Sequence, residues 1–116
     1  MDPKIENYMH GKWRKVINEM VEKCHSESVK HELWPSKSMH NEKFLHSAAM
    51  MKIVYKVASA YEASRDGQTG LIIQKLAQAM IAILDLAGDT CLDFGEEILL
   101  QLEKQQDAPK WEDPLA

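Results

Sequence analysis

The sequence comprises 116 residues, of which 45% are hydrophobic and 28% are charged, with a formal net charge of −4. This length and balance predict one soluble globular domain, and the lack of a dense basic stripe argues against nucleic acid as a partner. Without a leader, a membrane-span candidate or a CxxC pair, the protein is expected to be cytoplasmic, with Cys24 and Cys91 as buried free thiols.

The first predicted element is a helix over residues 1–25. Its apolar residues recur every three or four positions with polar residues between them, which is the spacing of an amphipathic helix. The stripe consists of Ile5, Tyr8, Met9, Trp13, Val16, Ile17, Met20, Val21 and Cys24. Residues 26–41 lack this periodicity, and Pro35 forces the residue before it away from helical geometry. We therefore expect residues 26–41 to form a connector.

Residues 42–107 are predicted to hold the core helices, followed by a proline-bearing tail over 108–116. One helix is expected from about 42 to 65 and a second over 71–87, stopped by Gly88, and both are apolar around most of their circumference. A last helix should start near Asp93. Two successive helices this apolar exceed what a small helical monomer can bury, so the sequence predicts an oligomer that assembles through them.

The five histidines do not form a recognisable metal motif. His25 and His31 are six residues apart, as are His40 and His46, and this gap does not place two imidazoles on one helical face. The sequence also lacks HExxH, GxSxG, P-loop and dinucleotide-binding glycine patterns. We therefore predict no metal ligands and no catalytic residues from these motifs, and we interpret the histidines as solvated or capping side chains.

Two segments resemble a known family. They are "MMKIVYKVASAYEASRDG" and "KLAQAMIAILDLAGDTCLDFGEEILLQLEKQQ", with the looser "CHSESVKHELW" upstream. Together they are similar to the all-α nucleoside triphosphate pyrophosphohydrolases, the MazG and dimeric dUTPase group. The apolar frame is in register, as are Glu62-Ala63, Arg65, Gly67 and the Asp85–Gly88 segment. The resemblance implies a MazG-like bundle of four to five helices that forms a homodimer or homotetramer.

The chain departs from this family at the positions that would hold magnesium. The resemblance implies carboxylates from an EExxE and an ExxD motif, but these positions hold Tyr55, Lys56, Ser59, Lys75 and Gln78. Magnesium needs several anionic oxygens in octahedral geometry, and ammonium groups repel it. The resemblance therefore implies that the hydrolytic activity has been lost, with no cofactor bound.

Lys56 and Lys75 allow three interpretations. Their ammonium groups can reach solvent while the stems cover apolar surface, or they can pair with Glu62 and Asp85, the acids on the same helices. In the third interpretation the two ammonium groups replace the metal ions and hold a phosphate or another anion. The predicted pocket then contains Lys56, Ser59, Lys75, Gln78, Tyr55, Glu62 and Asp85.

The sequence favours a catalytically inactive MazG-like protein that binds a nucleotide, another anionic small molecule or a protein partner. One alternative is an active, magnesium-dependent pyrophosphohydrolase with a displaced metal site. Its ligands would come from Glu62, Asp85, Asp89, Glu96 and Glu97. Another alternative is a structural oligomer without a ligand, because function depends on the site and not on the fold.

Overall fold

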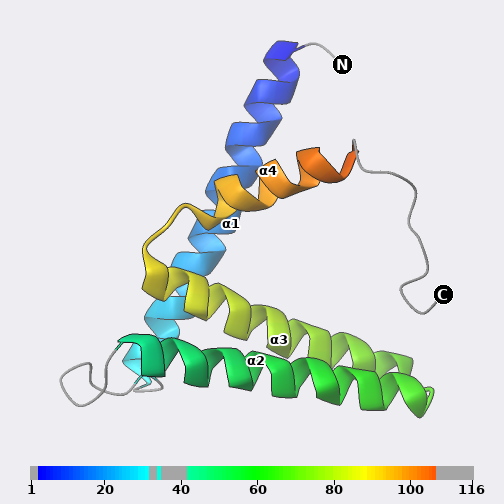
Figure 1. Ribbon diagram of the computed structural model, residues 1–116. Coiled ribbons are helices and arrows are strands. Elements are labelled where there is room, and N and C mark those ends of the chain that lie inside the picture. The colour runs from blue at the N-terminus through cyan, green and yellow to red at the C-terminus, as the bar shows by residue number, and fades with distance from the viewer. Residues whose placement is uncertain (1–2, 32–33, 35–41, 107–116) are drawn as a thin grey trace. The chain divides into compact units, whose positions relative to one another are not determined.

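The computed structural model describes residues 3–31, 34 and 42–106, and these residues form four α-helices without a strand. The helices are α1 (Pro3–Lys30), α2 (Glu42–Arg65), α3 (Thr69–Thr90) and α4 (Phe94–Gln106), shown in Figure 1. The all-α class predicted from the sequence is confirmed over this part of the chain.

The chain divides into two compact units, and the single domain over residues 1–116 stays a prediction from the sequence. One unit combines the residues up to Asn18 with those from Asp93 onward, and the other comprises Glu19–Leu92. The first unit therefore contains the start of α1 together with α4. The second contains the end of α1 together with α2 and α3.

Two helix boundaries differ from the predicted ones. α1 continues to Lys30, five residues beyond the predicted end at residue 25, because neither proline nor glycine interrupts residues 26–30. The His31 amide still donates to the Glu27 carbonyl at 3.0 Å. α3 passes through Gly88, the predicted stop, and ends at Thr90. Cys91 takes over the left-handed position at this end, with φ 58.

α2 and α3 form an antiparallel hairpin, and Figure 1 shows them side by side along their length. The turn between them depends on Gly67, whose φ of 73 favours glycine. The amides of Gly67 and Gln68 donate to the last carbonyls of α2, which closes its C-terminal end. Buried alanines lie along both helices, at Ala60, Ala63, Ala79 and Ala87.

Within the other unit, α4 packs against the first half of α1 at Gly95. A Cβ at Gly95 would lie 2.6 Å from the Arg14 carbonyl oxygen and 2.9 Å from Asn18 Oδ1, so only glycine permits this approach. Asp93 caps the helix, because its Oδ1 accepts a hydrogen bond from the Glu96 amide at 3.0 Å. The predicted start of the last helix near Asp93 is therefore confirmed.

Much of the predicted apolar surface stays exposed. Of the stripe predicted for the first helix, Tyr8, Trp13, Val16 and Met20 are at least 46% exposed, and Val21 is the buried member among the side chains described. One face of α2 is exposed and apolar between Met50 and Tyr61, at Met50, Met51, Val54, Val57, Ala58 and Tyr61. This face repeats every three to four residues, so it forms one continuous stripe along the helix.

α3 is the one described helix long and apolar enough to cross a membrane on length and composition, with a mean hydropathy of 1.5 in its most apolar window. The sequence predicted no membrane-span candidate because it placed this helix over residues 71–87, whereas the helix extends over 69–90. A core helix of a soluble protein has the same length and composition, so this feature alone does not identify a membrane protein.

Candidate functional site

The unit formed by Glu19–Leu92 contains a cavity of about 380 Å³, a size at the lower end of small-molecule sites. Each of three helices contributes side chains spaced three to four residues apart, which places them on one face of that helix. The lining residues are Lys23, Cys24, Glu27, Ser28 and His31 of α1 and the turn that follows it, Lys52 and Lys56 of α2, and Gln78, Ile81, Ala82 and Asp85 of α3.

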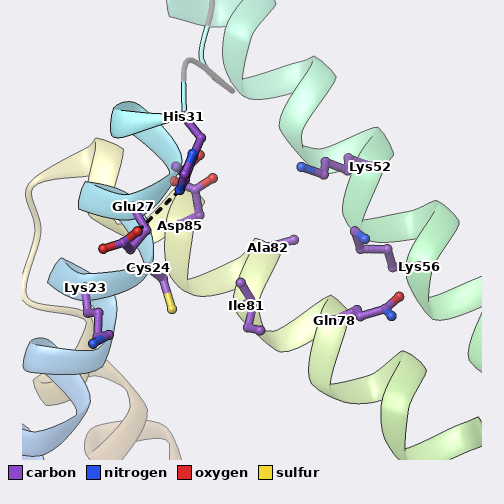
Figure 2. Close-up of a pocket in the computed structure, with 11 residues that line it drawn as sticks. Lys23, Cys24, Glu27, His31, Lys52, Lys56, Gln78, Ile81, Ala82 and Asp85 are labelled. Atoms are coloured by element: carbon purple, nitrogen blue, oxygen red, sulfur yellow. Dashed lines mark ion pairs between the residues drawn. The ribbon is translucent and has the colours of Figure 1, made fainter.

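The α2 wall of this cavity is cationic. Lys52 and Lys56 are one helical turn apart, and Figure 2 shows both side chains extending from α2 toward the space in front of α1 and α3. Among the described residues, neither ammonium group has a carboxylate within ion-pair distance. Gln78 of α3 extends toward Lys56 in the same view.

The α1 wall contains charges of both signs, at Lys23 and Glu27, beside the thiol of Cys24. Burial raises the pKa of the Cys24 thiol, and the nearby Asp85 carboxylate raises it further, so this side chain stays protonated at neutral pH. Glu27 and His31 form an ion pair at 3.5 Å, drawn as a dashed line in Figure 2. Ile81 and Ala82 of α3 add apolar surface between the α2 wall and the α1 wall.

Ser28 is the unusual member of the α1 wall. The residue is 6% exposed, and its hydroxyl has no hydrogen-bond partner among the described residues. A buried serine in a helix ordinarily donates to the carbonyl four residues earlier, and Ser28 does not. A polar group that is buried without a partner has a free-energy cost, so Ser28 lowers the stability of this part of α1.

Asp85 connects the cavity to a buried polar network. Its Oδ1 accepts hydrogen bonds from the Trp34 indole at 2.8 Å and lies 2.9 Å from His25 Nδ1. On the far side of the ring, His25 Nε2 is 3.9 Å from Asp89, whose other carboxylate oxygen lies 2.8 Å from His46 Nε2. The Asp89 side chain is 6% exposed. The network therefore ties α1, α2 and α3 together beside the cavity.

The structure brings together some of the residues predicted for the pocket. Lys56, Gln78 and Asp85 line the cavity. Ser59 and Lys75 do not line it and lie one turn nearer the tip of the α2–α3 hairpin. The remaining two are also outside the lining: Tyr55 is 73% exposed, and Glu62 is exposed as well.

The hydroxyl of Ser59 is occupied, because it donates to the Tyr55 carbonyl at 3.1 Å within α2. Asp85 does not pair with Lys56 or Lys75, because its carboxylate forms hydrogen bonds with His25 and Trp34. The interpretation in which Lys56 or Lys75 pairs with Glu62 or Asp85 has no support in the described ion pairs.

Sequence reasoning missed the other eight lining residues, which are Lys23, Cys24, Glu27, Ser28, His31, Lys52, Ile81 and Ala82. Lys52 precedes Lys56 by four residues, a spacing that places both on one helical face and that could have been recognised. Glu27, Ser28 and His31 were missed because the helix was predicted to end at residue 25, which assigned them to a connector.

The alternative prediction of a displaced magnesium site named five acidic residues as ligands, and the structure places them in separate surroundings. Asp85 and Asp89 belong to the network with the two histidines, and Glu62 is exposed on α2. Glu96 lies 2.9 Å from His10, and Glu97 accepts a hydrogen bond from Gln101. Over the residues that the structure describes, no group of three or more His, Cys, Asp or Glu side chains is placed to hold a metal ion.

No protein-family profile, curated protein or solved structure matches this chain. The resemblance to the MazG group therefore stays a prediction from two sequence segments. A function must then be inferred from the cavity and from the side chains that line it.

Proposed function

We propose that this protein binds a small anionic ligand in the cavity between α1, α2 and α3 and does not hydrolyse it. The observation that carries the proposal is the pair of ammonium groups of Lys52 and Lys56, which line one wall without a carboxylate partner among the described residues. Two cations one turn apart attract a phosphate or a carboxylate, and each can donate a charge-assisted hydrogen bond.

A nucleotide is the ligand class suggested by the sequence resemblance. Lys56 and Gln78 occupy positions where the resembling family has metal-binding carboxylates, and both line the cavity. An ammonium group and a neutral amide do not hold magnesium, so a phosphate would contact the protein directly. This supports a MazG-like protein whose site binds an anion without metal-dependent chemistry.

We also propose that the protein forms a homo-oligomer through the exposed stripe on α2. The stripe itself contains no charged residue, because the two lysines between Met50 and Tyr61, Lys52 and Lys56, lie on another face of the helix. A second copy can therefore pack on the stripe without burying an unpaired charge. A two-fold axis places the same stripe opposite itself, which makes one apolar surface sufficient for both partners. A dimer is the smallest assembly that covers it.

The anion-binding proposal is tested by titrating the protein with pyrophosphate and with ATP, each with and without magnesium, by isothermal calorimetry. We expect binding that does not need magnesium. The double variant Lys52→Glu/Lys56→Glu should bind about ten-fold more weakly or worse, as expected for loss of charge-assisted hydrogen bonds.

The matched control for this experiment is Lys43→Glu/Lys104→Glu, which changes the same charge at two exposed lysines outside the cavity. Its affinity should stay within about two-fold of the wild type, because exposed charges at a distance are screened. Equal losses in both double variants would contradict the proposed site. Release of pyrophosphate from ATP in the presence of magnesium would contradict the absence of catalysis.

A further inference from the structure

The acidic side chains that line the cavity have partners, whereas the lysines do not. Glu27 lies 3.5 Å from His31, and Asp85 forms hydrogen bonds with Trp34 and His25. Among the described residues, no carboxylate lies within ion-pair distance of the lining lysines, which are Lys23, Lys52 and Lys56. A ligand that matches this lining therefore has to bring anionic groups to the lysines.

Lys23 differs from the other two lysines in its position. It belongs to α1, whereas Lys52 and Lys56 belong to α2, so ammonium groups line two walls of the cavity. Figure 2 shows Lys23 and the two α2 lysines at separate ends of the lining, with Ile81 of α3 between them. A compact anion such as phosphate, held by Lys52 and Lys56, would leave Lys23 without an anionic partner.

We propose that the cavity binds an elongated dianion, which carries an anionic group at each end of an apolar body. This inference rests on the proposed anion-binding function and adds Lys23 to the site. One anionic group accepts hydrogen bonds from Lys52 and Lys56, and the other accepts one from Lys23. The apolar body packs on Ile81 and Ala82 of α3. Aliphatic dicarboxylates are the simplest ligands of this class.

The surroundings of Lys23 leave room for an anionic group there. Burial and the Asp85 carboxylate raise the pKa of the Cys24 thiol, while Lys23 acts in the opposite direction, so its ammonium group lies near the thiol. The thiol stays protonated at neutral pH and adds no negative charge. Glu27, one turn after Lys23 on α1, is paired with His31, as the dashed line in Figure 2 marks. The cavity lining then carries more ammonium groups than carboxylates, which favours an anionic ligand.

The test compares suberate with octanoate, which has the same chain length and one carboxylate fewer. Calorimetry measures both affinities for the wild type and for Lys23→Met and Lys23→Arg. The wild type should bind suberate about five-fold more tightly, the ratio expected for one exposed ion pair. Lys23→Met should lose most of this preference and bind octanoate as the wild type does, whereas Lys23→Arg should keep it because the charge remains. Adipate with hexanoate and glutarate with pentanoate extend the comparison to shorter chains.

The variant Lys15→Met is the matched control, since Lys15 is an exposed lysine on the same helix outside the cavity lining. It should keep the preference for the dicarboxylate. Lys56→Met should weaken suberate and octanoate by the same factor and leave their ratio unchanged, because both probes place a carboxylate on the α2 wall.

The outcomes separate this inference from the proposed function. If the wild type does not bind pyrophosphate, the anion site itself is wrong, and this inference fails with it. If pyrophosphate binds but no dicarboxylate is preferred over its matched monocarboxylate, or if the preference survives in Lys23→Met, the role of Lys23 is overturned and the anion site stands. Circular dichroism establishes that each variant is folded, and Lys23→Gln replaces Lys23→Met if that variant does not fold.

Discussion

Two glycines carry much of the local packing, each at a place where another helix comes close. A Cβ on Gly88 of α3 would overlap with the Cβ of His25 on α1, and Gly95 of α4 lies equally close to the backbone of α1 at Arg14. At Gly88 the absence of a Cβ leaves room for the His25 side chain, and at Gly95 it lets two backbones approach. The close approach at Gly88 also helps to hold His25 beside Asp85.

Gly88→Ala should therefore destabilise the protein, although alanine is the better helix former. The overlap with His25 should cost about 1–3 kcal/mol, the range found for overpacked positions. Urea unfolding followed by circular dichroism measures the change. The control is Gly11→Ala on α1, where no atom lies within 4 Å of the added Cβ, and there a gain of up to about 1 kcal/mol is expected. Equal gains at both positions would show that α1 does not pack against Gly88.

At the scale of whole elements, the start of α4 depends on one carboxylate. Asp93 caps the helix through the Glu96 amide, accepts a hydrogen bond from the Asn18 side chain and pairs with Arg14 at 2.9 Å. The hydrogen bonds from Asn18 and from the Glu96 amide are the main causes that lower the pKa of Asp93 below 3.8. The ionised form is therefore favoured in the folded protein.

The lowered pKa of Asp93 determines how the stability of α4 changes with pH. A carboxylate with a lowered folded pKa stabilises the fold above its unfolded pKa, and the contribution disappears as the pH falls through the folded pKa. α4 should therefore lose order below about pH 4, which the amide resonance of Glu96 reports in NMR spectra. In Asp93→Asn, which retains a capping oxygen, this acid-induced change should be absent. An unchanged transition in that variant would point to a different carboxylate.

The helices themselves could be predicted from apolar periodicity, but their packing could not. The bounds of α2 agree with the predicted range of about 42 to 65, because the apolar residues of this segment keep a helical spacing along its length. Gly88 was misread as a stop because sequence alone does not distinguish a helix-ending glycine from one at a helix crossing. The Asp85 and Asp89 network was missed for a related reason, since its histidines lie far away in sequence.

At the scale of the whole molecule, the main feature of the isolated chain is the apolar surface that stays exposed to solvent. The described core contains few large side chains, whereas Val54, Val57 and Tyr61 on α2 are 59%, 47% and 67% exposed. Apolar surface of this extent is typical of surfaces where another molecule binds, and it supports the proposed oligomer. The sequence predicted the excess correctly from composition, although it could not show which face of α2 remains uncovered.

Val54→Glu/Val57→Glu should shift the protein from an oligomer to a monomer. Two carboxylates on the stripe would be buried without partners in the assembly, which costs several kcal/mol. Size-exclusion chromatography with light scattering measures the mass. The control, Gln74→Glu/Gln106→Glu, adds the same charge at exposed polar positions and should leave the mass unchanged. A wild type that is monomeric at micromolar concentration, or that floats with lipid vesicles, would contradict a second copy as the occupant.

The left-handed backbone at Cys91 offers a practical route to the cavity. Glycine adopts a φ of 58 more readily than cysteine does, so Cys91→Gly should be tolerated at the end of α3. Since the chain contains two cysteines, that change leaves Cys24 as the sole thiol. A nitroxide label attached to Cys24 would then report occupancy of the cavity through the width of its spectral lines, whichever ligand is added.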